Sequence, residues 1–201
     1  MKVLFHRIAR LALFAISLPL FAQLPAITAK PRVRLTTNYG VIVLELEPTL
    51  APRTVENFLA YVRKGHYTGT IFHRVIPGFM IQGGGLSEEM SEKAGAAPIK
   101  NEAPQSFKAG LKNDKGTVAM ARTADPNSAT TQFFINMADN VSLDFKNESA
   151  DEIGYCTFGR VVEGMEVALK IEQVKTVWKK GQPNVPDYPV KIKSAEVLDA
   201  K

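Results

Sequence analysis

The chain has 201 residues and a formal net charge of +5, and 45% of its residues are hydrophobic while 22% are charged. This length fits one domain with a short extra segment, and the composition excludes a disordered chain and a scaffold held together by disulfides. The excess of basic residues raises the question of a nucleic-acid partner, so the location of these charges has to be examined.

Residues 1–29 form a segment that is typical of a secretory signal peptide. They begin with basic residues, continue with an apolar run over residues 11–22, and end with small residues at Ala22, Ala26 and Ala29. This order predicts export, with cleavage after one of those three alanines. The apolar run is short for a bilayer span, which needs about 20 apolar residues, although an uncleaved N-terminal anchor remains an alternative.

This segment changes the interpretation of the net charge. Of the 25 basic residues of the chain, Lys2, Arg7 and Arg10 lie in residues 1–29, which contain no acidic residue. Residues 30–201 therefore carry 22 basic and 20 acidic residues, a net charge of +2. A charge this small does not indicate nucleic-acid binding, and we expect no such partner and no stable membrane insertion after cleavage.

The cysteine and histidine content argues against thiol and metal chemistry. Cys156 is the single cysteine and lies in an apolar stretch, so we expect it in the core rather than as a nucleophile. His66 and His73 have no matching pattern of carboxylates or thiols around them, and we expect neither a metal nor another cofactor. A general base at His73 is the alternative for that residue.

The first elements after residue 30 are a hairpin and a helix. Two strand-like runs within residues 33–47 flank the turn Asn38-Tyr39-Gly40. Pro52 then suits the first position of a helix, and Gly65 suits its end. Between them, apolar residues recur at the i, i+3, i+4 and i+7 positions of one helical face, namely Val55, Phe58, Leu59 and Val62.

The rest of the chain predicts short strands, long loops and a second helix. The predicted strands are 70–76, 79–82, 117–122, 132–136, 155–161 and 190–197, the second helix spans about 165–172, and 83–116 and 123–131 are predicted loops. Many short strands with two helices indicate a mainly β protein built as a closed antiparallel barrel with helices over its ends.

Residues 71–85 are the most unusual stretch for chemistry. If the strand alternates regularly, Phe72, Arg74 and Ile76 lie on one side of it, which places a guanidinium between two large apolar side chains. Arg74 either extends from a barrel rim into water or is held beside an apolar pocket to contact a substrate. The glycines at 83–85 lack the Lys-Ser/Thr of a phosphate-binding loop and predict a turn or a bulge.

Two predicted strands each present an amide beside a large apolar side chain. Met80 and Gln82 share a face in one strand, and Gln132 and Phe134 share a face in another. This combination suits a site that packs an apolar ring and hydrogen-bonds a peptide backbone. Half-buried core positions are the alternative for each pair taken alone.

With these motifs, the sequence resembles the cyclophilins, a family of peptidyl-prolyl cis-trans isomerases. The resemblance covers nearly all of residues 33–199, and its specific parts are FHRVIPGFMIQGG at 72–84, GTVAMAR at 116–122, Ser128 through QFFI at 132–135, and FGRVVEGM at 158–165. It implies an eight-stranded antiparallel barrel capped by two helices, occupying residues 30–201 after the signal peptide. Together with residues 1–29, it resembles the periplasmic members from Gram-negative bacteria.

The resemblance also implies a role for individual residues. Arg74 corresponds to the catalytic arginine of the family. The residues expected to line the proline pocket or to hold the peptide are Phe79, Met80, Gln82, Ala121, the backbone of Arg122, Gln132, Phe134 and Leu143. Tyr155 stands where eukaryotic members have a histidine, and Ser142 where they have a tryptophan, which puts tight cyclosporin binding in doubt.

The function implied is isomerisation of X–Pro bonds without a covalent step, in support of the folding of exported proteins. The expected partners are unfolded or partly folded polypeptides that contain proline, and we expect the protein to be a monomer. Two alternatives belong to other classes. One is a binding module that grips proline segments with little turnover, and the other is a barrel that binds an apolar small molecule.

Overall fold

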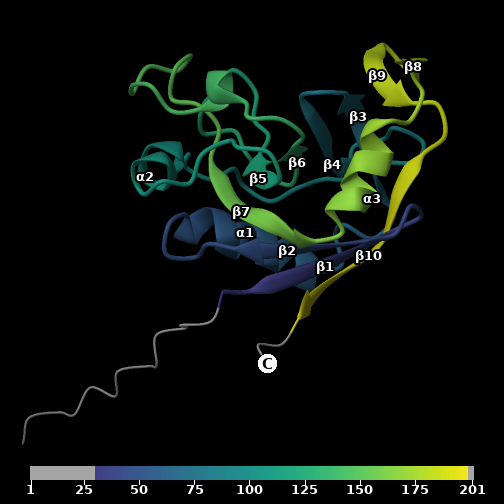
Figure 1. Ribbon diagram of the computed structural model, residues 1–201, viewed down its shortest axis with the longest axis horizontal. Coiled ribbons are helices and arrows are strands. Elements are labelled where there is room, and N and C mark those ends of the chain that lie inside the picture. Colours follow the sequence, from purple (N-terminus) through teal and green to yellow (C-terminus); the bar gives the residue numbers. More distant parts are fainter. Residues whose placement is uncertain (1–29, 199–201) are drawn as a thin grey trace, which may run out of the picture.

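The computed structural model in Figure 1 describes residues 30–198. The predicted signal peptide and its cleavage positions lie outside the described residues. Among the helices of the described part, none has both the length and the apolar character needed to cross a membrane.

Eight strands close into one antiparallel barrel. Around the barrel they follow the order β1 (Arg32–Thr37), β10 (Val190–Leu198), β3 (Thr70–Ile76), β4 (Met80–Ser87), β6 (Phe133–Asn136), β5 (Thr117–Met120), β7 (Thr157–Glu163) and β2 (Val41–Leu46). Every neighbouring pair is antiparallel, including β1 with β2, which closes the ring. The predicted fold class is therefore confirmed.

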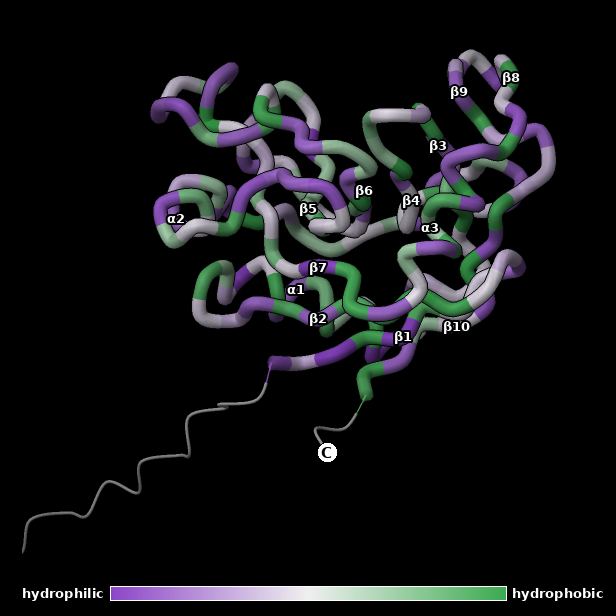
Figure 2. The backbone as a smooth tube through the Cα atoms, in the orientation of Figure 1, coloured by the Kyte–Doolittle hydropathy of each residue, from purple (hydrophilic) through white to green (hydrophobic). Residues whose placement is uncertain are grey.

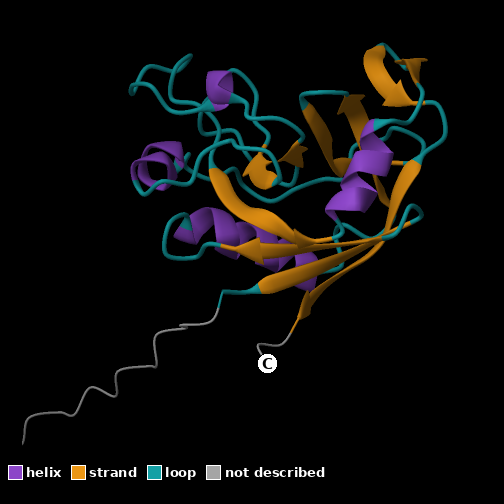
Figure 3. Cartoon of the chain, in the orientation of Figure 1, coloured by secondary structure: helices purple, strands orange, loops and turns teal. Residues whose placement is uncertain are grey.

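Helices lie against the outside and the ends of this barrel, as Figure 3 shows. The two predicted helices are present as α1 (Pro52–Arg63) and α3 (Met165–Glu172). A short helix α2 (Ala103–Lys108) and a 3-10 turn η1 (Val141–Leu143) were not expected. A separate hairpin of β8 (Thr176–Lys179) and β9 (Gln182–Pro186) projects beyond the barrel.

The predicted loop at 83–116 was wrong in part, while the other predicted strands after residue 116 begin and end within two residues of the observed ones. Residues 83–116 were expected to be a loop, but β4 continues to Ser87 and α2 forms within that range. Gly83–Gly85 lie inside β4, where the register against β3 slips as in a bulge. Glycine is required there because a Cβ on Gly84 would come within 2.8 Å of the Tyr67 ring and 2.9 Å of the Phe133 ring.

The start of α1 receives its cap from a distant residue. Ala51, which precedes the helix, has no side chain that can accept a hydrogen bond. The buried Glu102 carboxylate instead accepts the backbone N–H groups of Arg53 at 3.2 Å and Thr54 at 2.8 Å. This contact ties α1 to the segment that leads into α2, and it places a negative charge at the positive end of the helix dipole.

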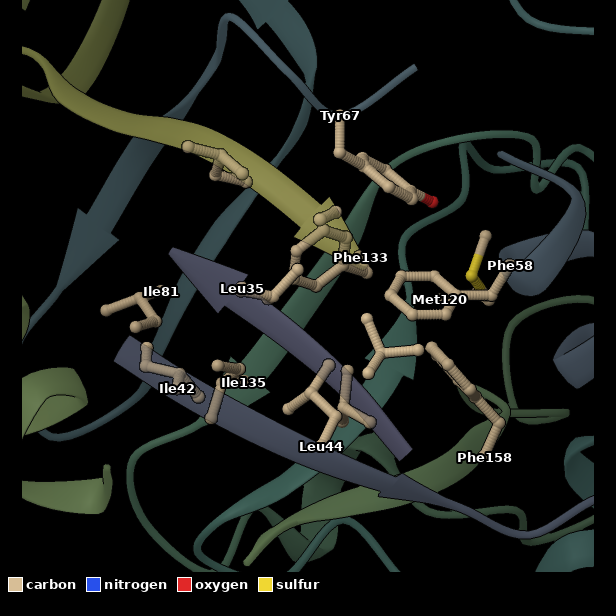
Figure 4. Close-up of a cluster of buried hydrophobic side chains, with 14 of the residues drawn as sticks. Leu35, Ile42, Leu44, Phe58, Tyr67, Ile81, Met120, Phe133, Ile135 and Phe158 are labelled. Atoms are coloured by element: carbon tan, nitrogen blue, oxygen red, sulfur yellow. The ribbon is translucent and has the colours of Figure 1, made fainter. Parts of the chain in front are cut away.

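The barrel interior is filled by one large hydrophobic cluster. Figure 2 shows hydrophobic and hydrophilic residues following one another along the strands, which is the pattern of a sheet with one buried face. Leu35, Ile42 and Ile135 from the strands are fully buried (Figure 4). The ring of Phe58 from α1 packs at 5.1 Å from the Phe158 ring, so α1 covers one end of the barrel.

A second, smaller hydrophobic cluster lies apart from this core. It contains Met80, Ala119 and Phe134 at its centre, and the partly buried Ile76, Phe79, Ala121, Leu143 and Tyr155 pack against them. Because neighbouring residues such as Ile81 and Ile135 belong to the interior cluster, strand alternation places this second cluster on the outer face of the barrel. Most of the residues singled out in the sequence meet there.

Candidate active site

A bulge in β3 decides where Arg74 points. Phe72 pairs with Gly83 and Arg74 pairs with Gln82, so β3 has one residue more than β4 between these two pairs. Phe72 consequently belongs to the interior cluster, whereas Arg74 lines a cavity on the outer face and Ile76 packs against the outer cluster. The expectation that Phe72 shares a face with Arg74 and Ile76 was wrong because an extra residue reverses the alternation.

Four strands bring the site together in a single row. Arg74 on β3 stands opposite Gln82 on β4, Gln82 stands opposite Phe134 on β6, and Phe134 stands opposite Ala119 on β5. Strand pairing thus places the guanidinium, an amide and an aromatic ring side by side at the spacing of neighbouring strands, about 5 Å. Met80 and Gln82 line one cavity, as their shared face predicts, whereas Gln132 precedes β6 and does not line it.

A cavity of about 170 Å³ opens over this row. It is lined by Arg74, Phe79, Met80, Gln82, Ala121, Arg122, Phe134, Leu143 and Tyr155. These are nine of the ten candidate residues from the sequence. The tenth, Gln132, does not line the cavity but accepts a hydrogen bond from Gln82 Nε2 at 2.9 Å.

Two wider depressions beside the N-terminus of α1 are less suited to an apolar ring. Their volumes are about 400 and 450 Å³, and both include Arg53 and Lys100 in their linings. Neither lining contains an aromatic residue. The smaller cavity combines Phe79, Phe134 and Tyr155 with polar groups, which is the composition typical of ligand sites.

A chain of amides fixes the Arg74 side chain. Arg74 Nη1 donates to Gln82 Oε1 at 3.2 Å, and Gln82 Nε2 in turn donates to Gln132 Oε1. Among the described residues, the Arg74 side chain makes only this hydrogen bond, so its other guanidinium N–H groups remain available to a ligand. Gln132 therefore acts on the site by orienting Gln82.

We expect Gly85→Ala to disturb the hydrogen bond between Gln82 and Gln132 without a change at Arg74 itself. A Cβ on Gly85 would lie 2.3 Å from Gln132 Cγ, so the flexible Gln132 side chain would have to move away from Gln82. The expected result is a fall in activity of about fivefold, the equivalent of roughly one hydrogen bond, with little loss of stability. Kinetics and urea unfolding measure the two quantities. Unchanged activity would show that the Gln132 contact does not matter.

Tyr155 and Arg122 form the opposite wall. The rings of Tyr155 and Phe134 meet edge to face, with 5.7 Å between their centroids. The Arg122 guanidinium carbon lies 4.6 Å from the centroid of the Tyr155 ring, within the range of a cation–π contact. Arg122 also donates to the carbonyl oxygens of Gly154 at 3.1 Å and Thr123 at 2.9 Å, so its side chain braces the wall.

Neither Cys156 nor His73 belongs to the cavity lining. Cys156 is 3% exposed, and burial raises the pKa of its thiol to about 11, so it is the protonated core residue that we expected. His73 is buried, and desolvation lowers the pKa of its imidazole to about 4. The side chain is therefore neutral at pH 7 and lies away from the cavity, which argues against a general base there.

The buried histidine predicts a loss of stability in mild acid. Because the pKa of His73 is about 4 in the folded chain and about 6.5 when unfolded, the unfolded chain binds a proton first as the pH falls below about 6.5. Stability is therefore complete above that pH and decreases below it, by about 2 kcal/mol between pH 6.5 and pH 5. Burial also lowers the pKa of His66, which adds to the loss of stability in acid.

Urea unfolding at pH 7 and pH 5 checks this expectation, with His73→Leu as the comparison. The variant should show a smaller difference between the two pH values because the contribution of His73 is removed. An equal difference in both proteins would contradict the assignment to His73.

Sequence reasoning missed a group of buried polar residues beside the cavity, on the same face of the barrel. Asn113, Asn136, Asn140 and Asp144 are all at most 7% exposed and are hydrogen-bonded to one another. One signal was available, since Asn136 follows Phe134 by two residues and therefore shares its outward face. Ser142, which bears on the cyclosporin expectation, is exposed beside Leu143, and that expectation stays a prediction.

Comparison with known proteins agrees with this geometry. Residues 32–197 match the family described as cyclophilin type peptidyl-prolyl cis-trans isomerase/CLD. The chain is 56% identical over 166 residues to the peptidyl-prolyl cis-trans isomerase cyp18 of Streptomyces antibioticus, covering 83% of this chain and 98% of that protein. It is 49% identical over 192 residues to peptidyl-prolyl cis-trans isomerase A of Dickeya dadantii, covering 96% and 97%.

A solved structure has the same fold. The cyclophilin type peptidyl-prolyl cis-trans isomerase of Cryptosporidium parvum, crystallised in the presence of the dipeptide Ala-Pro, superposes with a TM-score of 0.70 and 29% identity. The match covers 84% of this chain and 99% of that one.

Proposed function

The chain belongs to the cyclophilin-type peptidyl-prolyl cis-trans isomerases and catalyses rotation about X–Pro bonds, and we propose that the Arg74 cavity is where it does so. The observation that carries this proposal is the row of Arg74, Gln82 and Phe134 across three paired strands. It sets a charged donor beside an apolar floor, in a cavity lined by nine of the ten candidate residues.

The reaction needs no covalent intermediate. Resonance gives the peptide C–N bond partial double-bond character and a rotation barrier of about 18–20 kcal/mol. Uncatalysed X–Pro bonds exchange in about 10–100 s, and an acceleration of about 10⁵ corresponds to lowering the barrier by about 7 kcal/mol. Rotation breaks the resonance and leaves a lone pair on the prolyl nitrogen, so an enzyme can act by stabilising that twisted form.

Arg74 is the group that can recognise the twisted form. In our proposal, its guanidinium donates a hydrogen bond to the prolyl nitrogen while Gln82 holds the side chain in place. A hydrogen bond from a charged group contributes about 1.5–3 kcal/mol, which is part of the barrier lowering required. The remainder comes from the apolar surroundings, which disfavour the more polar planar amide, and from holding one side of the bond while the other rotates.

The substrates we propose are segments of unfolded or partly folded polypeptides that contain proline. Phe79, Met80 and Phe134 supply an apolar floor for the pyrrolidine ring, and the amide of Gln82 can hydrogen-bond the peptide backbone. The Cryptosporidium parvum relative was crystallised in the presence of Ala-Pro, which supports the same substrate class here.

We further propose that the protein is exported to the periplasm as a monomer and assists the folding of other exported proteins. The pattern of residues 1–29 supports export, and the alignment with the Dickeya dadantii isomerase reaches into this segment. Cell fractionation followed by N-terminal sequencing tests the proposal. A mature protein that begins after Ala22, Ala26 or Ala29 would support it, and an intact N-terminus in the cytoplasm would refute it.

The isomerase site is tested by exchange spectroscopy on a peptide that contains Ala-Pro. We expect the purified chain to accelerate cis–trans exchange, and Arg74→Ala to remove most of the acceleration. A chain that binds the peptide without accelerating exchange would instead be a binding module. Full acceleration by Arg74→Ala would place the reaction elsewhere.

A further inference from the structure

A buried polar network continues the outer face of the barrel beyond the cavity. We call it the Asn136 network, and it consists of Asn113, Thr117, Asn136, Asn140 and Asp144. Asn136 pairs with Met80 across β6 and β4. On each strand this pair lies two residues from the pair of Phe134 and Gln82, so both pairs share a face. The apolar floor of the cavity and this polar network are therefore adjacent parts of one sheet face.

Asn136 is the centre of the network and is completely buried. Its Nδ2 donates to Thr117 Oγ1 at 2.9 Å and to Asn113 Oδ1 at 3.2 Å. Its Oδ1 accepts from Asn140 Nδ2 at 2.7 Å. Both N–H groups and the carbonyl of this amide are thus used, and a buried network with its members satisfied favours a single arrangement.

The other ends of the network reach the backbone of three residues that line the cavity. Asn140 Nδ2 donates to the carbonyl of Phe79 at 2.8 Å. Asn113 Nδ2 lies within hydrogen-bond distance of the carbonyls of Leu143, at 3.1 Å, and Tyr155, at 3.3 Å. Asp144 Oδ1 accepts the Asn113 backbone N–H at 2.8 Å.

These three lining residues come from separate segments, and of the three only Leu143 and Tyr155 share a backbone hydrogen bond among the described residues, from the Tyr155 N–H to the Leu143 carbonyl at 2.9 Å. Phe79 lies in the turn between β3 and β4, Leu143 in η1, and Tyr155 just before β7. Turns and loops can shift independently unless side chains tie them together. We propose that the Asn136 network positions the walls of the proline cavity, an inference that rests on the proposed function of that cavity.

The kinetic signature follows from what the walls contact. Phe79, Leu143 and Tyr155 would pack on the proline ring, which keeps its shape while the amide rotates. Loss of their positioning should therefore weaken the binding of substrate and transition state equally, raising KM and leaving kcat nearly unchanged. Arg74 differs, since it acts on the nitrogen in the twisted state and should affect kcat.

Thr117 offers a matched pair of variants for the test. Thr117→Val removes the hydroxyl that accepts from Asn136, whereas Thr117→Ser retains it. The control is Thr70→Val, which removes a buried hydrogen bond to the Tyr67 carbonyl at the far end of β3. Exchange spectroscopy at increasing concentrations of an Ala-Pro peptide gives KM and kcat for each, and thermal unfolding gives their stability.

We expect Thr117→Val and Asn136→Leu to raise KM by about fivefold or more with kcat within about twofold of the original chain. Thr117→Ser should restore KM, and Thr70→Val should lose stability without a change in KM. Unchanged KM in Thr117→Val, or a fall in kcat alone, would overturn the inference. If Asn136→Leu does not fold, the Thr117 pair decides.

Arg74→Ala in the same experiment separates this inference from the proposed function. Full activity in Arg74→Ala would show that the cavity is not the site. Loss of activity in Arg74→Ala together with unchanged KM in Thr117→Val would leave the site intact and refute only the role of the network.

Discussion

Arg74→Lys should reduce kcat for X–Pro isomerisation by about 100-fold, the equivalent of losing one strong charge-assisted hydrogen bond. Lysine keeps the positive charge, so the comparison isolates the geometry of the donor. A planar guanidinium can donate to Gln82 Oε1 with one nitrogen and to the substrate with another, whereas a single ammonium cannot hold both positions.

Exchange spectroscopy at saturating peptide measures this effect. Arg160→Lys is the matched control, because Arg160 is exposed on β7 and does not line the cavity. We expect the control to retain full activity and normal stability. A rate for Arg74→Lys within about twofold of the original would mean that charge alone is sufficient, and the proposed hydrogen bond to nitrogen would be wrong.

Phe134→Ala should give the second large effect, through the floor of the cavity. Phe134 is 4% exposed and packs with Met80, Ala119 and the edge of Tyr155. Removing a buried phenylalanine ring costs about 3–5 kcal/mol of contacts. This cost lowers the stability of the free protein. Separately, the lost ring no longer contacts the proline ring, so we expect kcat/KM to fall by about 30-fold, the equivalent of about 2 kcal/mol.

Phe107→Ala controls for the loss of a ring. Phe107 lies in α2 and packs against Phe145, away from the cavity lining. Urea unfolding and exchange spectroscopy should show reduced stability in both variants and reduced kcat/KM only in Phe134→Ala. Equal kcat/KM in the two variants would show that Phe134 does not form part of the substrate site.

Alternation along single strands was sufficient to predict much of the site. Met80 with Gln82 and Gln132 with Phe134 could be assigned to shared faces because a strand repeats every two residues. The structure adds that Gln82 and Phe134 are register partners, so Met80, Gln82 and Phe134 line one cavity while Gln132 contacts Gln82. Five further lining residues were expected only from the resemblance to the cyclophilins, namely Phe79, Ala121, Arg122, Leu143 and Tyr155.

The features that the sequence did not predict depend on contacts between distant parts of the chain. The β3 bulge that separates Phe72 from Arg74 exists only relative to β4, so one strand read alone could not reveal it. Asn113 meets Asp144 across 31 positions and Glu102 caps α1 across 48, and no local pattern encodes either contact. The helix α2, with six residues, is too short to show a helical period.

The closure of the barrel has a consequence for how a polypeptide substrate can bind to it. Each of its eight strands has a hydrogen-bonded neighbour on both sides, from β1 around to β2. An open sheet would present unpaired N–H and C=O groups, onto which an extended polypeptide could add as another strand. In the closed ring most of these groups are already paired, although β3 and β10 pair at only two residues, so a proline-containing peptide can engage through the side chains of an outer cavity and depart. The barrel therefore leaves few places where an extended polypeptide substrate could add as a further strand and stay attached.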